Sequence, residues 1–187
     1  MNEKELIVRL KLGEESAFKL LVQNYQDRVY YSVLNILQNA DDAEEAAQET
    51  FIQVFESIKS FKEESSLGTW IYRIGVRKAL EKIRKQKTRQ RINSIIPWWM
   101  PSEAKSVNAA YLNPGINSEN KEKATILFKA IRELPNNQRV AFTLIPLQGM
   151  KHEEASEIMQ LSIKAIESLL SRAKENLKNK LKYYYNS

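Results

Sequence analysis

The stretch Ser162–Leu181, SIKAIESLLSRAKENLKNKL, decides how the C-terminal part of the chain folds. Apolar residues recur in it at steps of three and four, the period of one helix face: Ile163, Ile166, Leu170, Ala173 and Leu177. Ser162 stands directly before this stripe, where a side-chain oxygen can cap the first free N–H groups of a helix. The stretch therefore predicts a long amphipathic helix that begins after Ser162.

A second, shorter helix is predicted just upstream, over His152–Met159, and only Gln160 and Leu161 separate the two. A short helix, a tight turn and a longer capped helix form a helix-turn-helix pattern, whose second helix enters the DNA major groove. The alternative is an ordinary helical hairpin inside a bundle. The outward positions near the start of the longer helix are Lys164, Ala165, Glu167 and Ser168, followed by Ser171 and Arg172.

The whole composition favours an all-α fold. The 187 residues include only 5 Gly and 5 Pro, and no stretch alternates convincingly at the period of a β-strand. The chain has no Cys and a single His, so it can form no disulfide, thiol nucleophile, thiolate metal site or multi-histidine metal site. We expect no metal and no cofactor. No apolar run has the length of a signal peptide or a membrane span, which makes the cytoplasm the expected compartment.

Helical periodicity predicts two small domains joined by a flexible linker. The N-terminal domain covers residues 1–91, the linker residues 92–120 and the C-terminal domain residues 121–187. The linker holds three prolines and shows no helical period. Its apolar group is expected to dock on a domain or on a partner: Ile95, Ile96, Trp98, Trp99 and Met100. The predicted helices cover residues 3–12, 14–37, 42–60, 70–91, 121–134, 136–147, 152–159 and 162–181.

Charge is segregated within the N-terminal domain. Residues 41–58 carry six acidic residues and no basic one, whereas residues 59–91 carry eleven basic residues against three acidic ones. Adjacent blocks of opposite sign indicate two different partners. The alternative is that the two blocks neutralise each other across a helical hairpin.

The acidic block coincides with the third predicted helix. Its inward positions are Ala43, Ala47, Phe51, Val54, Phe55 and Ile58, and an opposite stripe holds Asp42, Glu45, Glu49, Gln53 and Glu56. Acidic residues in the first turn stabilise the helix dipole, but that does not explain Glu49 further along. Gln48 and Glu49 are therefore candidate partner contacts, with a plain solvated face as the alternative.

The basic block coincides with the fourth predicted helix. Trp70 stands at its head, Arg73, Arg77 and Arg84 lie in a row on the outer side, and Lys78 flanks the row. Arginines neutralise phosphates and read base edges, and aromatic rings stack on unpaired bases. This pattern favours a nucleic-acid surface. The alternative is that Trp70 belongs to the core and the arginines are ordinary surface residues.

Two segments resemble a known family. DDAEEAAQETFIQVFESI followed by SSLGTWIYRIGVRKALEKIRK is similar to region two of bacterial sigma factors, and AIRELPNNQRVAFTLIPLQGMKHEEASEIMQLSIKAIESLLSRAKENLKNKL is similar to region four. With only a linker between them, the chain resembles the extracytoplasmic-function (ECF) class. That resemblance implies a non-enzymatic subunit that binds core RNA polymerase, recognises two promoter DNA elements, promotes strand opening and is held by an anti-sigma factor.

The resemblance also implies roles for particular residues. The surface for the polymerase clamp would be Asp42, Glu45, Gln48, Glu49 and Phe51. The minus-ten element would be opened and held by Ser66, Thr69, Trp70, Arg73, Arg77, Lys78 and Arg84. The minus-thirty-five element would be read in the major groove by Ser162, Lys164, Ala165, Glu167, Ser168 and Arg172.

The chain departs from the family pattern at several of these positions. Arg77 stands where the family often has an Asn that faces DNA. Glu167 and Leu169 replace a usual Lys and Arg in the recognition helix; Glu167 would repel phosphate but can accept from a cytosine amino group. Gln160 replaces the usual turn glycine, and Pro146 is unusual at its position.

Two other functions compete with this interpretation. A stand-alone helix-turn-helix regulator would leave the acidic helix and the helix headed by Trp70 without a role. A small helical enzyme acting on nucleic acid would need a base, a nucleophile or a metal cluster. Its candidates are His152, for which capping or a surface role is the simpler explanation, and a Mg²⁺ site at Asp41, Asp42, Glu45 and Glu49.

Overall fold

The computed structural model describes residues 2–93 and 118–185, and every regular element in these ranges is helical. The elements are α1 (Glu3–Lys11), α2 (Glu15–Leu37), α3 (Ala40–Ser57), the single turn η1 (Ile58–Ser60), α4 (Leu67–Asn93), α5 (Ser118–Arg132), α6 (Asn136–Phe142), η3 (Thr143–Leu147), α7 (His152–Met159) and α8 (Ile163–Tyr185). The predicted all-α class is confirmed. None of the described helices combines the length and apolar composition that crossing a bilayer requires.

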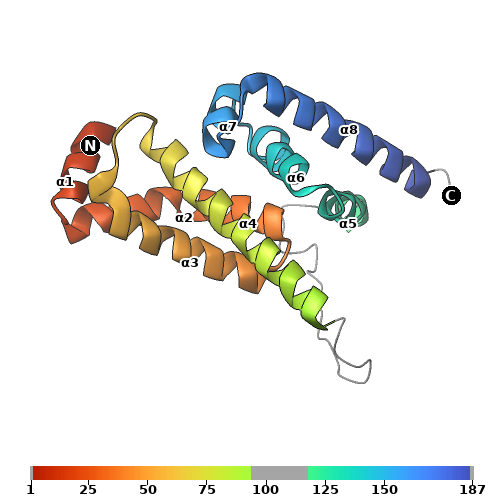
Figure 1. The fold of residues 1–187 in the computed structure, drawn as a ribbon, viewed down its shortest axis with the longest axis horizontal. Coiled ribbons are helices and arrows are strands. Elements are labelled where there is room, and N and C mark those ends of the chain that lie inside the picture. Colours follow the sequence, from red (N-terminus) through yellow and green to blue (C-terminus); the bar gives the residue numbers. More distant parts are fainter. Residues whose placement is uncertain (1, 94–117, 186–187) are drawn as a thin grey trace.

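The N-terminal domain, residues 2–93, is a bundle of three long helices (Figure 1). α2, α3 and α4 pack on one another, and α1 packs at the end of the bundle beside η1. Large apolar side chains fill the centre of their shared core, where Leu21, Val29, Leu34, Val54 and Ile71 have no exposed surface. Burial of this apolar surface is the main source of the stability of the domain.

The ends of the first three helices follow local sequence signals. Asn2 caps α1 by accepting a hydrogen bond from Glu5 N–H at 2.8 Å, and Gly13 closes that region with φ +81°. The junction between α2 and α3 differs from the prediction. Gln38 ends α2 in the left-handed conformation, and Asn39 caps α3 by accepting from Asp42 N–H at 2.9 Å, so α3 begins at Ala40 rather than at residue 42 as predicted. Asn is favoured both at a left-handed helix end and as an N-cap, so the sequence pattern alone did not show which role Asn39 takes.

The C-terminal domain, residues 118–185, consists of α5, α6, η3, α7 and α8. The predicted helix over residues 136–147 changes at Phe142 into a π-helical turn that contains Pro146. Gln148 N–H donates to the Thr143 carbonyl at 3.0 Å, five residues back, so the turn widens around the proline. Gly149 then stops the segment with φ +68°.

The helix-turn-helix is present as predicted. α7 spans His152–Met159, Gln160 turns the chain with φ 54°, and the Ser162 hydroxyl accepts from Ala165 N–H at 3.2 Å to cap α8. α8 runs to Tyr185, beyond the predicted end at residue 181. Its apolar stripe is buried: Ile166, Leu170, Ala173 and Leu177 are each at most 6% exposed.

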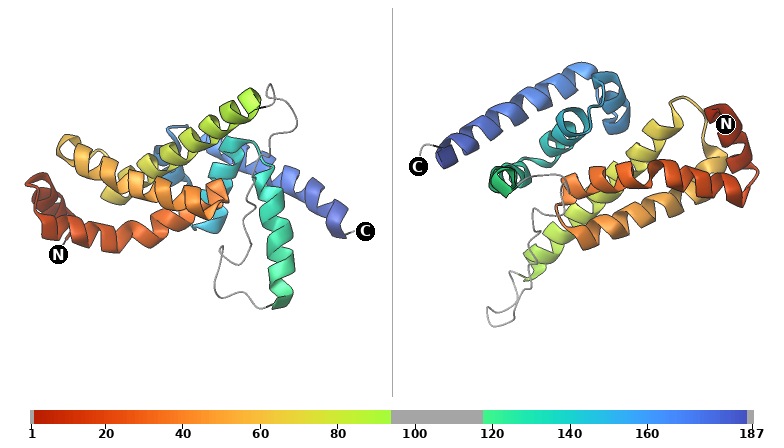
Figure 2. Two further views of the ribbon diagram at one scale, coloured as in Figure 1. Left: turned by 90° about the horizontal axis from the view of Figure 1, so that it is seen from below. Right: turned by 180° about the vertical axis from the view of Figure 1, so that it is seen from behind.

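The two domains pack against each other (Figures 1 and 2). Val140, Leu144, Ile158 and Ile166 belong to the same buried cluster as the core of the N-terminal domain, and α7 packs on α4. Most of the predicted linker, including the apolar group from Ile95 to Met100, lies outside the described residues.

A buried arginine connects the domains. Arg139 of α6 is 9% exposed, and its guanidinium donates to the Ile36 carbonyl of α2 at 3.0 Å and to the Leu134 carbonyl at 3.2 Å. It also donates to the Arg132 carbonyl at 2.5 Å. Burial, together with the neighbouring Arg132 charge, lowers the pKa of the Arg139 guanidinium. Arg139 therefore satisfies carbonyl groups at the ends of α2 and α5 that those helices leave without partners.

We predict that Arg139→Ala lowers the free energy of unfolding by about 2 kcal/mol, because buried carbonyl groups on both domains lose their donor. Arg132→Ala is the matched control, since its exposed side chain can be removed while its backbone carbonyl remains. Urea unfolding followed by circular dichroism measures both. Equal stability of the two variants would contradict the role given to Arg139.

Candidate nucleic-acid interface

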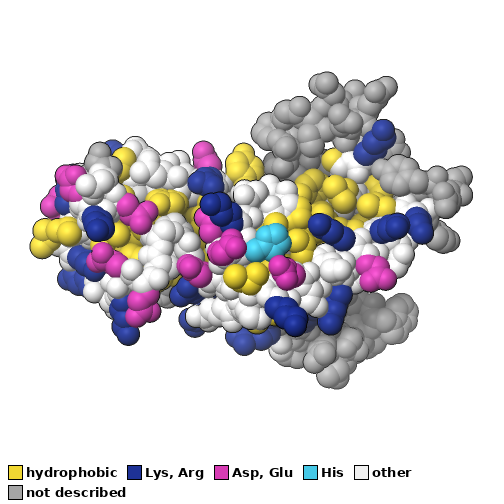
Figure 3. Space-filling model, turned by 90° about the horizontal axis from the view of Figure 1, so that it is seen from above, with side chains coloured by type: hydrophobic (Ala, Val, Ile, Leu, Met, Phe, Trp, Pro, Cys, Tyr) yellow, Lys and Arg dark blue, Asp and Glu magenta, His cyan; other side chains and the backbone are white. Residues whose placement is uncertain are grey.

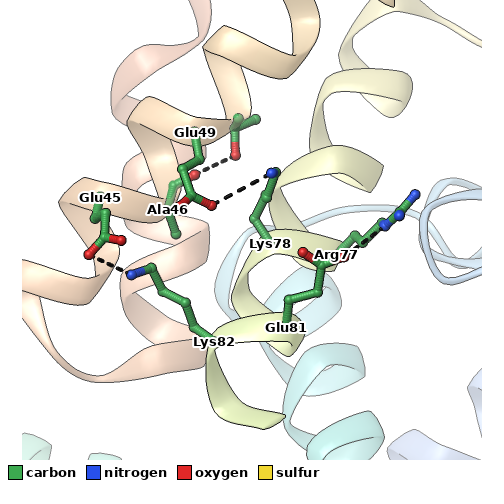
Figure 4. Close-up of polar contacts among 8 residues, drawn as sticks. Glu45, Ala46, Glu49, Arg77, Lys78, Glu81 and Lys82 are labelled. Atoms are coloured by element: carbon green, nitrogen blue, oxygen red, sulfur yellow. Dashed lines mark hydrogen bonds and ion pairs between the residues drawn. The ribbon is translucent and has the colours of Figure 1, made fainter. Parts of the chain in front are cut away.

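The side of α3 that faces α4 is ion-paired (Figure 4). Lys82 of α4 lies 2.7 Å from the Glu45 carboxylate and 3.8 Å from Asp42, and Lys78 lies 3.6 Å from Glu49. The Lys82 side chain is only 12% exposed, so this pair is better shielded from solvent than an ordinary surface salt bridge. Asp42, Glu45 and Glu49, three of the residues predicted to bind polymerase, are thus engaged within the domain.

These ion pairs bear on whether the acidic and basic blocks bind different partners or neutralise each other. The acidic and basic blocks do neutralise each other across α3 and α4, through Lys78 and Lys82. Gln86 adds a hydrogen bond to Asp42 at 2.6 Å. Arg73 and Arg77 have other partners: Arg73 contacts α7, and Arg77 pairs with Glu81 within α4.

A second face of α3 is exposed and partly apolar. Glu44, Gln48, Ile52 and Phe55 lie at steps of four, four and three, which places them on one stripe, and Glu44 accepts a hydrogen bond from Gln48 at 3.4 Å. Ile52 is 58% exposed and Phe55 is 59% exposed. The prediction that Phe55 faces inward is therefore wrong. Phe55 instead lies against Phe18, with ring centroids 5.2 Å apart.

Phe51 is one of the residues predicted to bind polymerase, a role that requires an exposed side chain. Its side chain is 9% exposed and belongs to the core cluster. Sequence reasoning missed Ile52 and Phe55, although both continue the helical stripe that begins at Glu44 and Gln48. The exposed surface of α3 therefore consists of a polar start and an apolar continuation, a composition typical of protein–protein contacts.

A groove of about 1230 Å³ lies between the two domains. Its apolar lining comes from both domains and includes Ile74, Leu80, Val140, Ile158 and Met159. Its polar lining includes Arg73, Arg77, Arg84, Lys87, Asn136 and Asn137. The groove, which Lys78 also lines, therefore combines an apolar surface with five basic side chains, and it contains most of the residues predicted to hold the minus-ten element.

The loop at the head of α4 is held by its own hydroxyl groups. The Ser66 hydroxyl accepts from Thr69 N–H at 3.1 Å, and the hydroxyls of Ser66 and Thr69 lie 2.9 Å apart. Ser66 is exposed, whereas Thr69 is 7% exposed. Ser66 is thus available to a ligand, and the Thr69 side chain mainly supports the turn. α4 begins at Leu67, three residues earlier than predicted.

Trp70 and Arg73 are both partly occupied by other protein groups. The Trp70 indole lies against the Phe61 ring with centroids 4.8 Å apart, so one of its faces is covered. Arg73 is half-buried and donates to the Glu157 carbonyl in the last turn of α7 at 3.1 Å. A guanidinium at a helix C-terminus is stabilised by the helix dipole. Arg73 therefore contacts the C-terminal domain through this hydrogen bond.

The other basic residues predicted for this site differ in their availability. Arg77 has an 81% exposed side chain and pairs with Glu81 one turn along at 3.0 Å, an arrangement that contributes only a few tenths of a kcal/mol, roughly 0.3–0.5. Arg84 is exposed, whereas Lys78 is turned toward Glu49 of α3 (Figure 4). Arg77 and Arg84 are therefore the cations most readily offered to a phosphate.

The residues predicted to read the minus-thirty-five element lie on the exposed side of α8. Lys164, Glu167, Ser168 and Arg172 are exposed, Ala165 is half-buried, and Ser162 holds the cap of the helix. On the face of the molecule seen from above, acidic and basic side chains are interspersed (Figure 3). This face is therefore not uniformly basic.

Two family models match the chain. The Sigma-70 region 2 family model matches residues 21–89, and the Sigma-70 region 4 model matches residues 125–177. The chain is 31% identical over 186 residues to the ECF RNA polymerase sigma-E factor of Haemophilus influenzae, covering 97% of this chain and 96% of that protein. This chain belongs to the ECF family of RNA polymerase sigma factors. It is also 30% identical over 191 residues to the sigma-E factor of Escherichia coli, covering 97% and 95% of the two chains.

Solved structures support the fold of this sigma factor. CnrH, solved in complex with the cytosolic domain of CnrY, aligns with a TM-score of 0.71 at 20% identity over 97% of both chains. RpoE of Bartonella quintana, solved with the anti-sigma factor NepR, aligns with a TM-score of 0.66 at 22% identity over 88% of this chain and 96% of that one. At these identities the likeness concerns the fold.

We predict that Lys82→Met lowers the free energy of unfolding by about 1 kcal/mol, because Asp42 and Glu45 lose the cation between them. Lys85→Met is the matched control, since Lys85 is exposed on the same helix. The difference between the two variants should shrink in 1 M NaCl, where charges are screened within about 3 Å. A Lys82→Met variant as stable as Lys85→Met in low-salt thermal unfolding would exclude a stabilising role for this pair.

Proposed function

We propose that this sigma factor is a non-catalytic subunit that brings core RNA polymerase to promoters in the cytoplasm and supplies the surfaces for strand opening. The observation that carries the proposal is the combination of three separate surfaces in a chain of this family. They are the exposed stripe of α3, the basic groove side of α4 and the capped helix α8. A stand-alone helix-turn-helix regulator has a use for α8 alone.

The polymerase-binding surface that we propose is the exposed stripe Glu44, Gln48, Ile52 and Phe55. The pairing of Asp42, Glu45 and Glu49 with lysines of α4 favours a structural contribution from these three carboxylates. The exposed stripe is free of those pairs and ends in two large apolar side chains. It suits a partner that offers donors to Gln48 and Glu44 and apolar side chains to Ile52 and Phe55.

For strand opening we propose Ser66, Trp70, Arg77 and Arg84. Trp70 has one ring face covered by Phe61 and can offer the rest of the indole to an unpaired base, and Arg77 and Arg84 are exposed about two and four turns further along. Arg73 joins this set only when its hydrogen bond to Glu157 is released. DNA binding along α4 therefore competes with α7.

For the upstream element we propose Lys164, Glu167, Ser168 and Arg172 on α8, with Ala165 contributing an apolar contact. Lys164 and Arg172 suit phosphates or guanine, whereas the Glu167 carboxylate accepts from a cytosine amino group. A cytosine in the part of the minus-thirty-five element that faces Glu167 is the sequence preference that this residue implies.

We also propose that an anti-sigma factor uses the groove between the domains. Both solved structures described above are complexes, one with the cytosolic domain of CnrY and one with the anti-sigma factor NepR. The groove of this chain offers Ile74, Met159 and Leu161 beside Arg77 and Arg84. An amphipathic helix with acidic residues on its polar face has the complementary chemistry.

We predict that Gln48→Lys combined with Ile52→Asp weakens the affinity for core RNA polymerase roughly tenfold, because a contact of about 1.4 kcal/mol is lost at the centre of the stripe. Both side chains are exposed, so circular dichroism should show an intact fold. Gln26→Lys on the exposed face of α2 is the control. Unchanged co-purification of the double variant with polymerase would reject this surface.

We predict that Trp70→Ala combined with Arg77→Ala impairs open-complex formation on a duplex promoter while polymerase binding stays near normal. Loss of a stacked aromatic costs about 1–3 kcal/mol per base, and loss of one phosphate contact lowers the salt slope by roughly one unit. The promoter is obtained by mapping transcription start sites after overproduction of the protein. The same variant should be less impaired on a pre-melted promoter.

Thermal unfolding of this double variant is the necessary control, because Trp70 packs on Phe61 and its loss removes buried surface. Arg77→Ala alone, at an exposed position, separates the DNA contact from the fold. A stably folded double variant that opens duplex DNA as fast as the parent protein would show that this helix does not hold the melted strand.

A further inference from the structure

The first helix contacts the loop at the head of α4, although the two are some sixty residues apart in sequence. The Glu3 carboxylate of α1 accepts a hydrogen bond from Leu67 N–H at 3.2 Å. Leu67 is the first residue of α4, so its N–H is one of the groups that a helix cannot satisfy internally. Ser66 serves the N–H of Thr69 in the same turn. The cap of α4 is therefore shared between its own loop and a different helix.

A second contact joins α1 to the other end of this loop. The Lys11 ammonium lies 2.6 Å from the Glu63 carboxylate. Glu63 has φ +60°, a left-handed conformation that is uncommon for a residue with a side chain and needs support from its surroundings. The ion pair supplies such support. The loop is thus attached to α1 at residue 63 and again at residue 67.

α1 is itself fixed to the bundle. Leu6, Ile7 and Leu10 are each at most 6% exposed and belong to the core, and Arg9 pairs with Glu14 at 2.7 Å where α2 begins. A helix that packs on the core through three buried apolar side chains moves little relative to that core. Contacts from such a helix restrict the loop more than contacts within the loop do.

Two further contacts hold the head of α4 against the bundle. The Tyr25 ring of α2 lies against Gly68, where an added Cβ would approach it to 3.2 Å, and Phe61 packs on Trp70. Burial, with a further contribution from the Glu3 charge, raises the pKa of Tyr25, in keeping with its position beside this carboxylate. Residues of α1, α2 and the loop therefore fix the first turn of α4 together.

We infer that Glu3 and Lys11 are positioning residues for strand opening: α1 holds residues 61–69 in the conformation that receives unpaired promoter DNA. This inference rests on the proposed role of Ser66 and Trp70. Neither Glu3 nor Lys11 needs to touch DNA. Their effect is to reduce the freedom that the loop would otherwise lose on binding, which is the general benefit of a pre-organised site.

The decisive test compares Glu3→Ala with Glu3→Gln in holoenzyme reconstituted with core polymerase, on the mapped promoter carrying a fluorescent base in the minus-ten element. Glu3→Ala removes the acceptor for Leu67 N–H and should slow opening roughly fivefold, the scale of a lost helix cap. Glu3→Gln keeps an acceptor oxygen and should restore most of the rate. Lys4→Ala, a neighbouring exposed position, is the matched control and should open at the parental rate.

Hydrogen exchange in the free protein reports the loop directly. Glu3→Ala should speed exchange at Leu67 and Thr69 while the amides of α2 keep their protection, because only the loop is released. A charge swap tests the second contact: Lys11→Glu should slow opening, and adding Glu63→Lys should restore it.

Two outcomes would overturn the inference. One is parental opening by Glu3→Ala. The other is equal loss in Glu3→Ala and Glu3→Gln together with faster exchange throughout α2, which would show general destabilisation. Trp70→Ala in the same assay separates this inference from the proposed function. Parental opening by a folded Trp70→Ala variant rejects the strand-opening role of the loop, whereas impaired opening there with parental opening by Glu3→Ala rejects only the role of α1.

Discussion

Burial of one face of α4 is the constraint on which the rest of the structure depends. Ile71, Val76 and Ala79 are at most 5% exposed and pack in the core with α2 and α3. Burial of a large aliphatic side chain contributes about 1.5–3 kcal/mol, so this face determines how the helix is rotated. Once this face is buried, the helical period determines where the remaining side chains of α4 point. Lys82 points toward α3, and Arg73 and Arg77 point toward the groove.

This rotation gives the basic residues of α4 different neighbours. Lys78 and Lys82 pair with carboxylates of α3, whereas Arg73, Arg77 and Arg84 line the groove, which Lys78 and Lys87 also border. The two kinds of contact suit the chemistry of the two groups. A lysine acts as a compact point charge between carboxylates, whereas an arginine offers a planar set of donors to phosphates, base edges and backbone carbonyls. The net charge of the block therefore overstates the surface available to nucleic acid.

The sequence predicted those features that depend on neighbouring residues. The turn at Gln160, the cap at Ser162 and the bounds of α7 follow from local periodicity and were predicted correctly. Features that join distant residues were not visible, such as Arg139 beside the Ile36 carbonyl or Lys82 between Asp42 and Glu45. Phe55 shows the limit within a single helix. Its angular position is close to that of buried Phe51, and periodicity alone did not locate the edge of the core.

The packing of the two domains links DNA binding to their separation. Arg73 donates to the Glu157 carbonyl, so a phosphate that uses Arg73 must displace α7. Separation also exposes Val140 and Ile158, which are buried in the shared cluster, and leaves the Ile36 carbonyl without its Arg139 donor. A ligand shifts such an equilibrium only by its difference in affinity for the two states. Under the proposed role of Arg73, a promoter that uses this residue binds the separated form more tightly than the packed one, and a partner seated in the groove stabilises the packed form by the same rule.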